Sequence, residues 1–245
     1  WGKSDNIRVT DILNPLDFRE PGLTDIEDLR LPLAMSRADY YLGDFSLTGI
    51  AIHEIRFDKL PAYGSDFYPF PDPPPHDEKP ANTLDNTEFA AALNGIFSGW
   101  DMSLYWANVY NDSARIQMNP TTPIPSFTRT HDRIHMIGSG LNFVLGNWLL
   151  KIEAAYFTDL QFNNTGDENF SRLDGLIGFE YSGLKDTTIR LELADRHIVG
   201  YNEDIETAPD NVKEDESQTA IRITRTFLND TMTMTFLANL FGTWG

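Results

Sequence analysis

Acidic and basic side chains two residues apart are the feature of this chain with the clearest chemical consequence. Lys151 and Glu153 form one such pair, and Arg190 and Glu192 form another, each alternating with apolar residues. Two-residue spacing places side chains on one face of a β-strand. A face with both signs of charge can form ion pairs across strands and suits a water-filled interior. The residues predicted to line or constrict it are Arg30, Arg37, Asp39, Glu54, Arg56, Lys151, Glu153, Arg190 and Glu192.

Two interpretations are open for the residues of this set that precede position 60. Arg30, Arg37, Asp39, Glu54 and Arg56 can form structural ion pairs that hold a segment folded into the interior. They can also select a substrate, and the two roles are compatible. Both interpretations require that the segment lies against the strands.

Residue types suited to catalysis or metal binding are poorly spaced. His131 and His135 are four residues apart, which on a strand separates them by about 13 Å, too far for one metal ion. Cysteine is absent, so disulfides and thiolate sites are excluded. Phosphate-loop and nucleophile-elbow motifs are also absent. We therefore expect no enzymatic activity, catalytic residue, metal or cofactor.

Oxygen-bearing side chains gather in the stretch 159–170. Asp159, Asn163, Asn164, Asp167 and Glu168 are the types that bind calcium. Their spacing is not that of an EF-hand loop, so a solvated turn is the preferred interpretation.

The composition restricts the classes of partner. A net charge of −18 argues against nucleic-acid binding, which needs a basic stripe. No stretch of about 18 apolar residues is available for a transmembrane helix. The chain starts at Trp1, without a methionine or a signal peptide, so we expect a mature or excised fragment.

Alternation of apolar and polar residues predicts ten strands in five hairpins. The pattern is clearest in 230–241, where Met232, Met234 and Phe236 alternate with threonines. The predicted strands are 34–42, 45–54, 88–98, 100–110, 133–145, 147–158, 171–182, 186–198, 217–228 and 230–241.

The connections between these strands alternate between short and long. Short turns are predicted at Gly43-Asp44, Gly99, Gly146-Asn147, Leu184-Lys185 and Asn229-Asp230, where glycine, asparagine and aspartate tolerate positive φ. The long connections are 55–87, 111–132, 159–170 and 199–216. All short turns should therefore lie at one end of the sheet. This asymmetry, together with strands of about 9–11 residues or more, is typical of a transmembrane β-barrel.

The two faces of each strand then receive opposite environments. We predict that one set of residues points outward to lipid: Met232, Met234, Phe236, Ile189, Leu191, Ile152 and Ala154. We predict that another set points inward: Thr233, Arg190, Glu192, Lys151 and Glu153. Aromatic residues near the strand ends fit the girdles found at membrane interfaces.

Residues 1–33 lack a long strand and are predicted to fold inward as a segment that constricts the interior, with 34–245 forming the barrel. Short helices are expected at 5–13 and at 24–30, the second with Thr24 as its cap. We expect Arg8, Arg19 or Arg30 to pair with carboxylates of the strand wall. The proline-rich stretch 67–75 is predicted to be part of the largest loop.

Several short sequence motifs near the N-terminus resemble those of one protein family. They are Trp1-Gly2-Lys3-Ser4-Asp5, Asp11-Ile12-Leu13-Asn14-Pro15-Leu16-Asp17, Asp28-Leu29-Arg30-Leu31-Pro32, Glu54-Ile55-Arg56-Phe57 and Gly64-Ser65-Asp66-Phe67. The family consists of uncharacterised Gram-negative outer-membrane proteins that carry a domain of unknown function and are described as porin-like. The matching motifs lie within about residues 1–70. Over the rest of the chain, the resemblance is one of pattern only.

The resemblance implies more than the residues alone. Members are barrels longer than this chain, which implies that it is an internal portion. Some are associated with exporters of hydrophobic compounds, which implies an envelope exporter system as a partner. The expected function is then a porin-like channel in the bacterial outer membrane for hydrophobic or small organic compounds, with outer-membrane lipids and small-molecule solutes as partners and no nucleic acid. The alternatives are a barrel hydrolase with its site at the loop end and a soluble β-rich carbohydrate-binding protein.

Overall fold

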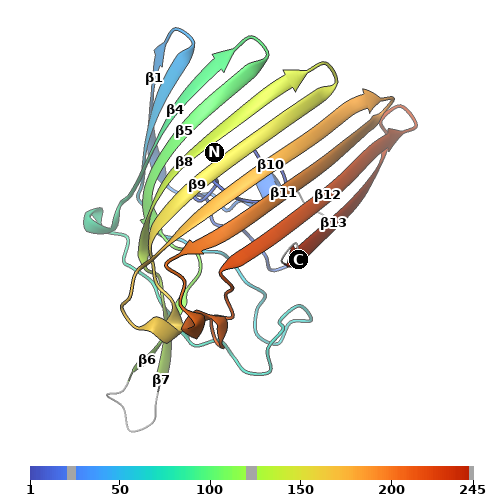
Figure 1. Cartoon of the computed structure of the whole chain (residues 1–245). Helices are drawn as coiled ribbons and strands as arrows, with labels where there is room; N and C mark the ends of the chain where they lie inside the picture. Colours follow the sequence, from blue (N-terminus) through green and yellow to red (C-terminus); the bar gives the residue numbers. More distant parts are fainter. Residues whose placement is uncertain (21–25, 120–125, 243–245) are drawn as a thin grey trace.

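A curved antiparallel sheet makes up most of the protein, as a computed structural model shows (Figure 1). The structure describes residues 1–20, 26–119 and 126–242. Within these residues, ten strands form the sheet. They are β1 (Met35–Leu42), β2 (Phe45–Ile52), β4 (Glu88–Phe97), β5 (Trp100–Tyr110), β8 (Arg133–Leu145), β9 (Trp148–Leu160), β10 (Phe170–Leu184), β11 (Thr187–Val199), β12 (Asp215–Phe227) and β13 (Met232–Gly242).

The strands follow one another across the sheet in their order along the chain. The order is β1-β2-β4-β5-β8-β9-β10-β11-β12-β13, and every neighbouring pair is antiparallel. At the middle of β10, for example, Ile177 lies opposite Ile152 on one side and Leu193 on the other. The predicted all-β class and the ten predicted strands are confirmed, with strand ends shifted by a few residues at most.

The short turns share one end of the sheet, as predicted. The hairpins β1–β2, β4–β5, β8–β9, β10–β11 and β12–β13 all turn at the upper rim in Figure 1. Glycines with positive φ occupy three of these turns, at Gly43, Gly99 and Gly146. Because consecutive strands are antiparallel, the long connections must then gather at the opposite rim.

The opposite rim contains structure that the sequence analysis missed. A small sheet there joins β3 (His76–Glu78), β7 (Ser126–Thr130) and β6 (Arg115–Asn119) in that order. The short 3-10 helices Leu84–Asn86, Asn163–Thr165 and Glu203–Glu206 lie in the same connections. Strands of three to five residues give too few alternations for a period to be recognised within a polar segment.

The sheet has two free edges. Strands β1 and β13 end the strand order, and within the described residues no pairing joins them. The sheet is therefore curved but open (Figure 1). The prediction was a transmembrane barrel or a large portion of one, and no closed barrel is seen among the described residues. Among the described residues, no helix is both long and apolar enough to cross a membrane.

The two faces of the sheet differ sharply in exposure. Apolar side chains on one face are exposed, such as Ile137 at 65% and Ile177 at 39%. Charged side chains on the other face are buried, such as Glu153 at 2% and Asp174 at 1%. The predicted outward residue Ala154 is exposed, and the predicted inward residues Lys151, Glu153 and Glu192 are buried, which confirms the assignment of faces on β9 and β11. On the edge strand β13 the predicted inward Thr233 is exposed, as are Met232, Met234 and Phe236, because an edge strand has a neighbour on one side only.

Residues 1–16 cover the charged face. Ile7, Val9 and Leu13 pack with buried apolar residues of the sheet, including Ala107, Met136 and Phe157, in one hydrophobic core. This segment contains no helix, so the helix predicted at 5–13 is wrong. The second predicted helix appears as the single turn α1 (Ile26–Leu29), while its expected cap Thr24 lies outside the described residues.

The turn at Gly99 provides a test of the hairpin geometry. Its φ of +83° is a conformation that a residue with a Cβ atom adopts at a cost of about 1–2 kcal/mol. We expect Gly99→Ala to lower the free energy of unfolding by that amount in a urea titration followed by tryptophan fluorescence. Gly49→Ala is the control, because its φ is not positive and no heavy atom lies within 4 Å of the added Cβ. Equal stability of the two variants would contradict the turn geometry.

Candidate functional site

The carboxylate of Glu153 on β9 holds the first residues of the chain against the sheet. Oε1 accepts hydrogen bonds from the backbone N–H of Lys3 (2.6 Å) and Ser4 (2.5 Å). Oε2 accepts from the backbone N–H and the hydroxyl of Thr10, at 3.1 and 2.6 Å. A buried carboxylate needs such donors, because an unpaired charge away from water is strongly unfavourable.

Glu192 on β11 makes a second set of contacts of the same kind. Its Oε1 accepts from the backbone N–H of Asp5 at 2.7 Å. Its Oε2 accepts from the backbone N–H of Asn6 and Ile7, both at 2.9 Å. Glu153 and Glu192 together therefore satisfy the backbone donors of residues 3–7 and of Thr10, which explains why this segment needs no helix.

Charged side chains of the segment add ion pairs to these contacts. Asp5 Oδ2 lies 2.5 Å from Lys151 Nζ and 3.4 Å from Arg190 Nε. Arg190 also pairs with Glu180 of β10 at 2.6 Å. Four of the residues predicted from the sequence, Lys151, Glu153, Arg190 and Glu192, are thus brought together around residues 3–10.

Glycines on β8 make room for the segment. A Cβ atom on Gly138 would lie 2.9 Å from Cγ2 of Thr10, and one on Gly140 would lie 2.8 Å from Cγ of Lys3. Both distances are shorter than van der Waals contact. Glycine at these two positions therefore leaves space for Thr10 and Lys3 of the N-terminal segment.

The other predicted site residues lie elsewhere. Arg37 pairs with Asp39 on the edge strand β1, where Asp39 also accepts a hydrogen bond from Thr48 at 2.6 Å. Glu54 pairs with Arg56 directly after β2 and accepts the backbone N–H of Ala34. Each of these two pairs stabilises local chain geometry.

Of the three arginines named as candidates for pairing with the wall, one reaches beyond the segment and two do not. Arg30 pairs with Asp11 at 2.7 Å, and Arg19 pairs with Asp17 at 2.6 Å, both within the segment itself. Only Arg8 reaches beyond it, to Asp112 just after β5, at 3.9 Å. Wall carboxylates do accept from the segment, but the donors are its backbone N–H groups and Lys3, which pairs with Asp101 of β5, and not Arg19 or Arg30.

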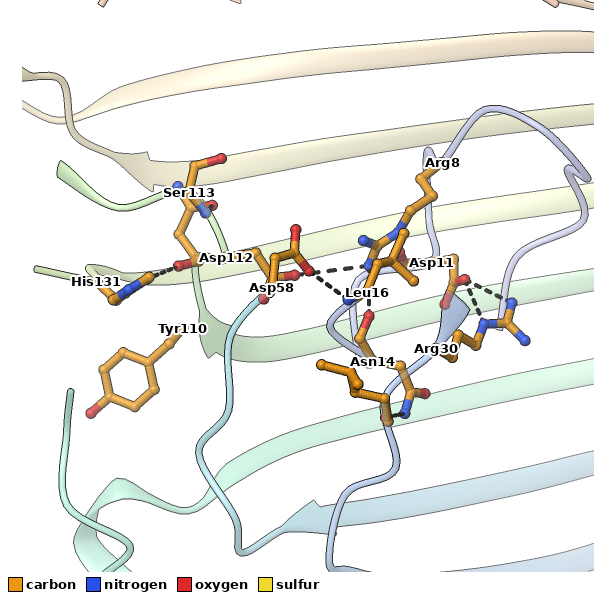
Figure 2. A network of polar contacts seen from close by, with 12 residues as sticks. Arg8, Asp11, Asn14, Leu16, Arg30, Asp58, Tyr110, Asp112, Ser113 and His131 are labelled. Atoms are coloured by element: carbon orange, nitrogen blue, oxygen red, sulfur yellow. Dashed lines mark hydrogen bonds and ion pairs between the residues drawn. The ribbon is translucent and has the colours of Figure 1, made fainter. Parts of the chain in front are cut away.

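Figure 2 shows the network around Arg8. Arg8 donates to the backbone oxygens of Asp11 (2.6 Å) and Asn14 (3.0 Å) and faces Asp112. Asp58 lies beside it and accepts the backbone N–H of Leu16 at 2.6 Å. Burial, reinforced by the nearby charge of Asp58, raises the pKa of Asp112 to about 7. Burial also raises the pKa of Asp58.

His131 fixes the neighbouring loops to one another. Its Nδ1 lies 2.7 Å from the carbonyl oxygen of Asn111, and its Nε2 lies 3.2 Å from Asp77. The ring stacks on Phe57 with centroids 3.3 Å apart, and burial lowers its pKa. With both nitrogens occupied, His131 links loop segments and is not positioned as a base.

Residues of the oxygen-rich loop 159–170 form hydrogen bonds with another part of the protein. Asp210 accepts the backbone N–H of Asn163 and Asn164, and it also accepts the side-chain amide of Asn163. Among the described residues, no cluster of three or more acidic, histidine or cysteine side chains is placed to hold a metal ion. The contacts of this loop thus join it to the 199–216 connection.

Cavities follow the charged face from the loop rim toward the segment. One of about 370 Å³ lies between the 159–170 and 199–216 connections. A second, of about 220 Å³, contains Arg8, Asp58 and Asp112. A third, of about 530 Å³, lies between the N-terminal residues 5–20 with α1 on one side and strands β12 and β13 on the other. Among the described residues, Arg196 of β11 contributes to the lining of all three.

The sequence analysis did not select the residues at this junction. Arg172 pairs bidentately with the buried Asp174 (2.6 and 2.8 Å), and Arg196 lies 3.7 Å from the same carboxylate. Alternation does place all three on the inward face, near the loop end of their strands. Their proximity to Arg8 and Asp112 depends on the path of the N-terminal segment, which gives no periodic signal.

Comparisons with known proteins identify a family but no activity. A family model described as "Protein of unknown function (DUF1302)" matches residues 1–244. Searches among curated proteins and among solved structures found no match.

Removing the carboxylate of Glu153 tests how the segment is held. We expect Glu153→Ala to lower the free energy of local opening at residues 3–10 by about 1–3 kcal/mol, because it leaves buried N–H donors without an acceptor. Hydrogen exchange of the Lys3, Ser4 and Thr10 amides measures this change. Glu168→Gln, in an exposed loop, should leave these rates unchanged. Unaltered exchange in Glu153→Ala would show that the segment is held by other contacts.

The raised pKa values of Asp58 and Asp112 predict a pH dependence. The folded protein keeps protons on these carboxyls that the unfolded chain releases, so stability falls as pH rises from about 4 to about 7 and is then constant. Hydrogen exchange at residues 8 and 110–113 should show this loss after correction for intrinsic rates. Asp112→Asn should reduce the slope of the profile, because Asp58 still titrates, whereas Asp44→Asn, at the opposite rim, should leave the slope unchanged. A profile that is flat in the unmodified protein would contradict the assignment.

Proposed function

The chain belongs to the DUF1302 family of proteins of unknown function, and we propose that within this family it forms the wall of a porin-like channel in the bacterial outer membrane. The proposed cargo is hydrophobic or small organic compounds. Outer-membrane lipids would surround the wall, and an envelope exporter system is the proposed protein partner.

One observation carries this proposal: one face of the sheet exposes large apolar side chains, while the other face buries charged side chains beside an apolar core. Large apolar side chains such as Leu104, Ile137 and Leu173 cover the exposed face, while Lys151 and Glu153 are buried on the other. Contiguous exposed apolar surface of this extent is rare in soluble monomers. Strands that alternate apolar-out and polar-in are expected of a wall between lipid and water.

Aromatic residues at the short-turn rim support the same proposal. Trp100 stacks with Phe97 and Phe143, at centroid distances of 4.3 and 6.1 Å. Trp148 lies 4.5 Å from Tyr181 on the neighbouring hairpins. Such rings favour the boundary between hydrocarbon and water, so they would form a girdle at this rim.

The N-terminal segment would then narrow the channel from the inside. Irregular backbone at membrane depth is tolerated only where protein or water satisfies its polar groups. Glu153 and Glu192 supply acceptors to residues 3–10 in this way. The exposed apolar face argues against the soluble carbohydrate-binding alternative, and the occupied nitrogens of His131 give no support to the hydrolase alternative.

Conductance in planar lipid bilayers tests the proposal. We expect the purified protein to insert and give stepwise currents, and deletion of residues 1–33 to increase the step size, because the lumen is then wider. Heat-modifiable migration on a gel would verify that the deletion variant is folded, and Gly49→Ala should conduct like the parent. Absence of current from folded protein, or solubility without detergent, would contradict the channel. Unchanged steps in the folded deletion variant would place the segment outside the conduction path.

A further inference from the structure

Arg196 lines several cavities, and its contacts with other residues use few of its hydrogen-bond donors. It lies near the loop end of β11, and three cavities meet at its side chain. Among the residues that the structure describes, its single hydrogen bond is a long one, from Nη2 to the carbonyl oxygen of Arg8 at 3.4 Å. A guanidinium group has five N–H donors, so most donors of Arg196 remain available to the cavities.

The neighbouring acid does not consume these donors. Asp174 accepts both of its short hydrogen bonds from Arg172, at 2.6 and 2.8 Å. Arg196 Nε lies 3.7 Å from Asp174, beyond hydrogen-bond distance. The side chain of Arg196 is 34% exposed, so a molecule in the cavity can reach it.

The cavity of about 370 Å³ combines basic and apolar lining. Its basic side chains are Arg115, Arg172, Arg196 and Lys213, and its apolar side chains are Leu160, Phe162, Ile198, Pro209 and Val212. Arg115 is held by Asp132, at 3.2 Å, and by the carbonyl oxygen of Gly166. Arg196 and the exposed Lys213 are therefore the cations most able to bind an added anion.

The two acids of the lining do not cancel this charge. Asp210 is engaged by the backbone N–H groups of Asn163 and Asn164. Glu216 lies opposite Arg196 in the strand pairing and attracts it, but Glu216 is exposed, so water weakens this attraction. The volume lies in the range of small-molecule sites, which typically have apolar walls and a few polar groups.

We propose that this cavity binds a small organic acid, with its carboxylate on Arg196 and Lys213 and its apolar body against Phe162, Ile198 and Val212. The planar fork of a guanidinium matches a carboxylate bidentately, as Arg172 and Asp174 show in the same site. The apolar wall favours an organic acid over an inorganic anion. Binding at this site does not depend on the proposed channel. Only the role of the site in transport rests on that proposal: if the channel exists, organic acids are its favoured solutes.

Binding of benzoate to the detergent-solubilised protein, measured by isothermal titration calorimetry, tests the site without a membrane. We expect saturable binding, with the neutral isostere benzamide weaker by about tenfold or more, because it lacks the charge-assisted hydrogen bonds. Arg196→Gln should weaken benzoate by a similar factor and leave benzamide unchanged. Arg196→Lys should be intermediate, since it keeps the charge and loses the fork. Lys185→Gln, in the turn at the opposite rim, should bind like the parent.

Lys213→Gln provides a second variant that does not disturb packing, because Lys213 is exposed. It should weaken benzoate by about two- to fivefold. Phe162→Ala should reduce the affinity for benzoate more than that for acetate. Equal affinity for benzoate and benzamide, no saturable binding, or a folded Arg196→Gln variant with unchanged affinity would overturn the proposal.

Conductance then separates the failure of this site from failure of the channel. Saturable benzoate binding in a protein that gives no current would leave the organic-acid site standing and overturn the channel. Current without benzoate binding would leave the channel standing and overturn the organic-acid site.

Discussion

The structure depends on how buried carboxylates on a β-sheet are satisfied. Glu153 and Glu192 point to the concave face, and water does not surround them. Their charges require donors, and the backbone N–H groups of residues 3–10 provide them. The same contacts relieve the segment of the need for internal hydrogen bonds. One set of hydrogen bonds therefore satisfies both the buried carboxylates and the backbone of the segment. Removing either the carboxylates or the segment leaves polar groups without partners.

This attachment also creates the cavities. With residues 3–10 held at β9 and β11, residues 8–16 must continue toward the loop rim. There Arg8 meets Asp112 and Asp58, which come from connections after β5 and β2. The segment does not fill this region, and the remaining space is lined by Arg172, Arg196 and the neighbouring loops. The proposed lumen and the proposed organic-acid site are both consequences of where the segment is fixed.

The division into two faces and two rims was available from the sequence. A period of two along β9, β11 and β13 assigned inward and outward residues, because successive side chains of a strand point to opposite faces. Turn residues such as Gly99 and Gly146 marked the ends of hairpins, and strict antiparallel order then placed every short turn at one rim. These are local rules, so each needs only a few consecutive residues to act.

The contacts that define the site came only from the tertiary structure. A helix was predicted at residues 5–13 because their local pattern allows one. In the structure, acceptors from residues about 150 and 190 positions away take the place of helical hydrogen bonds. Arg30 and Arg19 found acids within their own segment, so the charge pattern alone misassigned them. The junction at Arg196 joins the N-terminus, four connections and the last strands. The sequence determined strands, turns and faces because these follow from neighbouring residues. The partners of buried charges were decided by the path of an irregular segment, which no periodicity specifies.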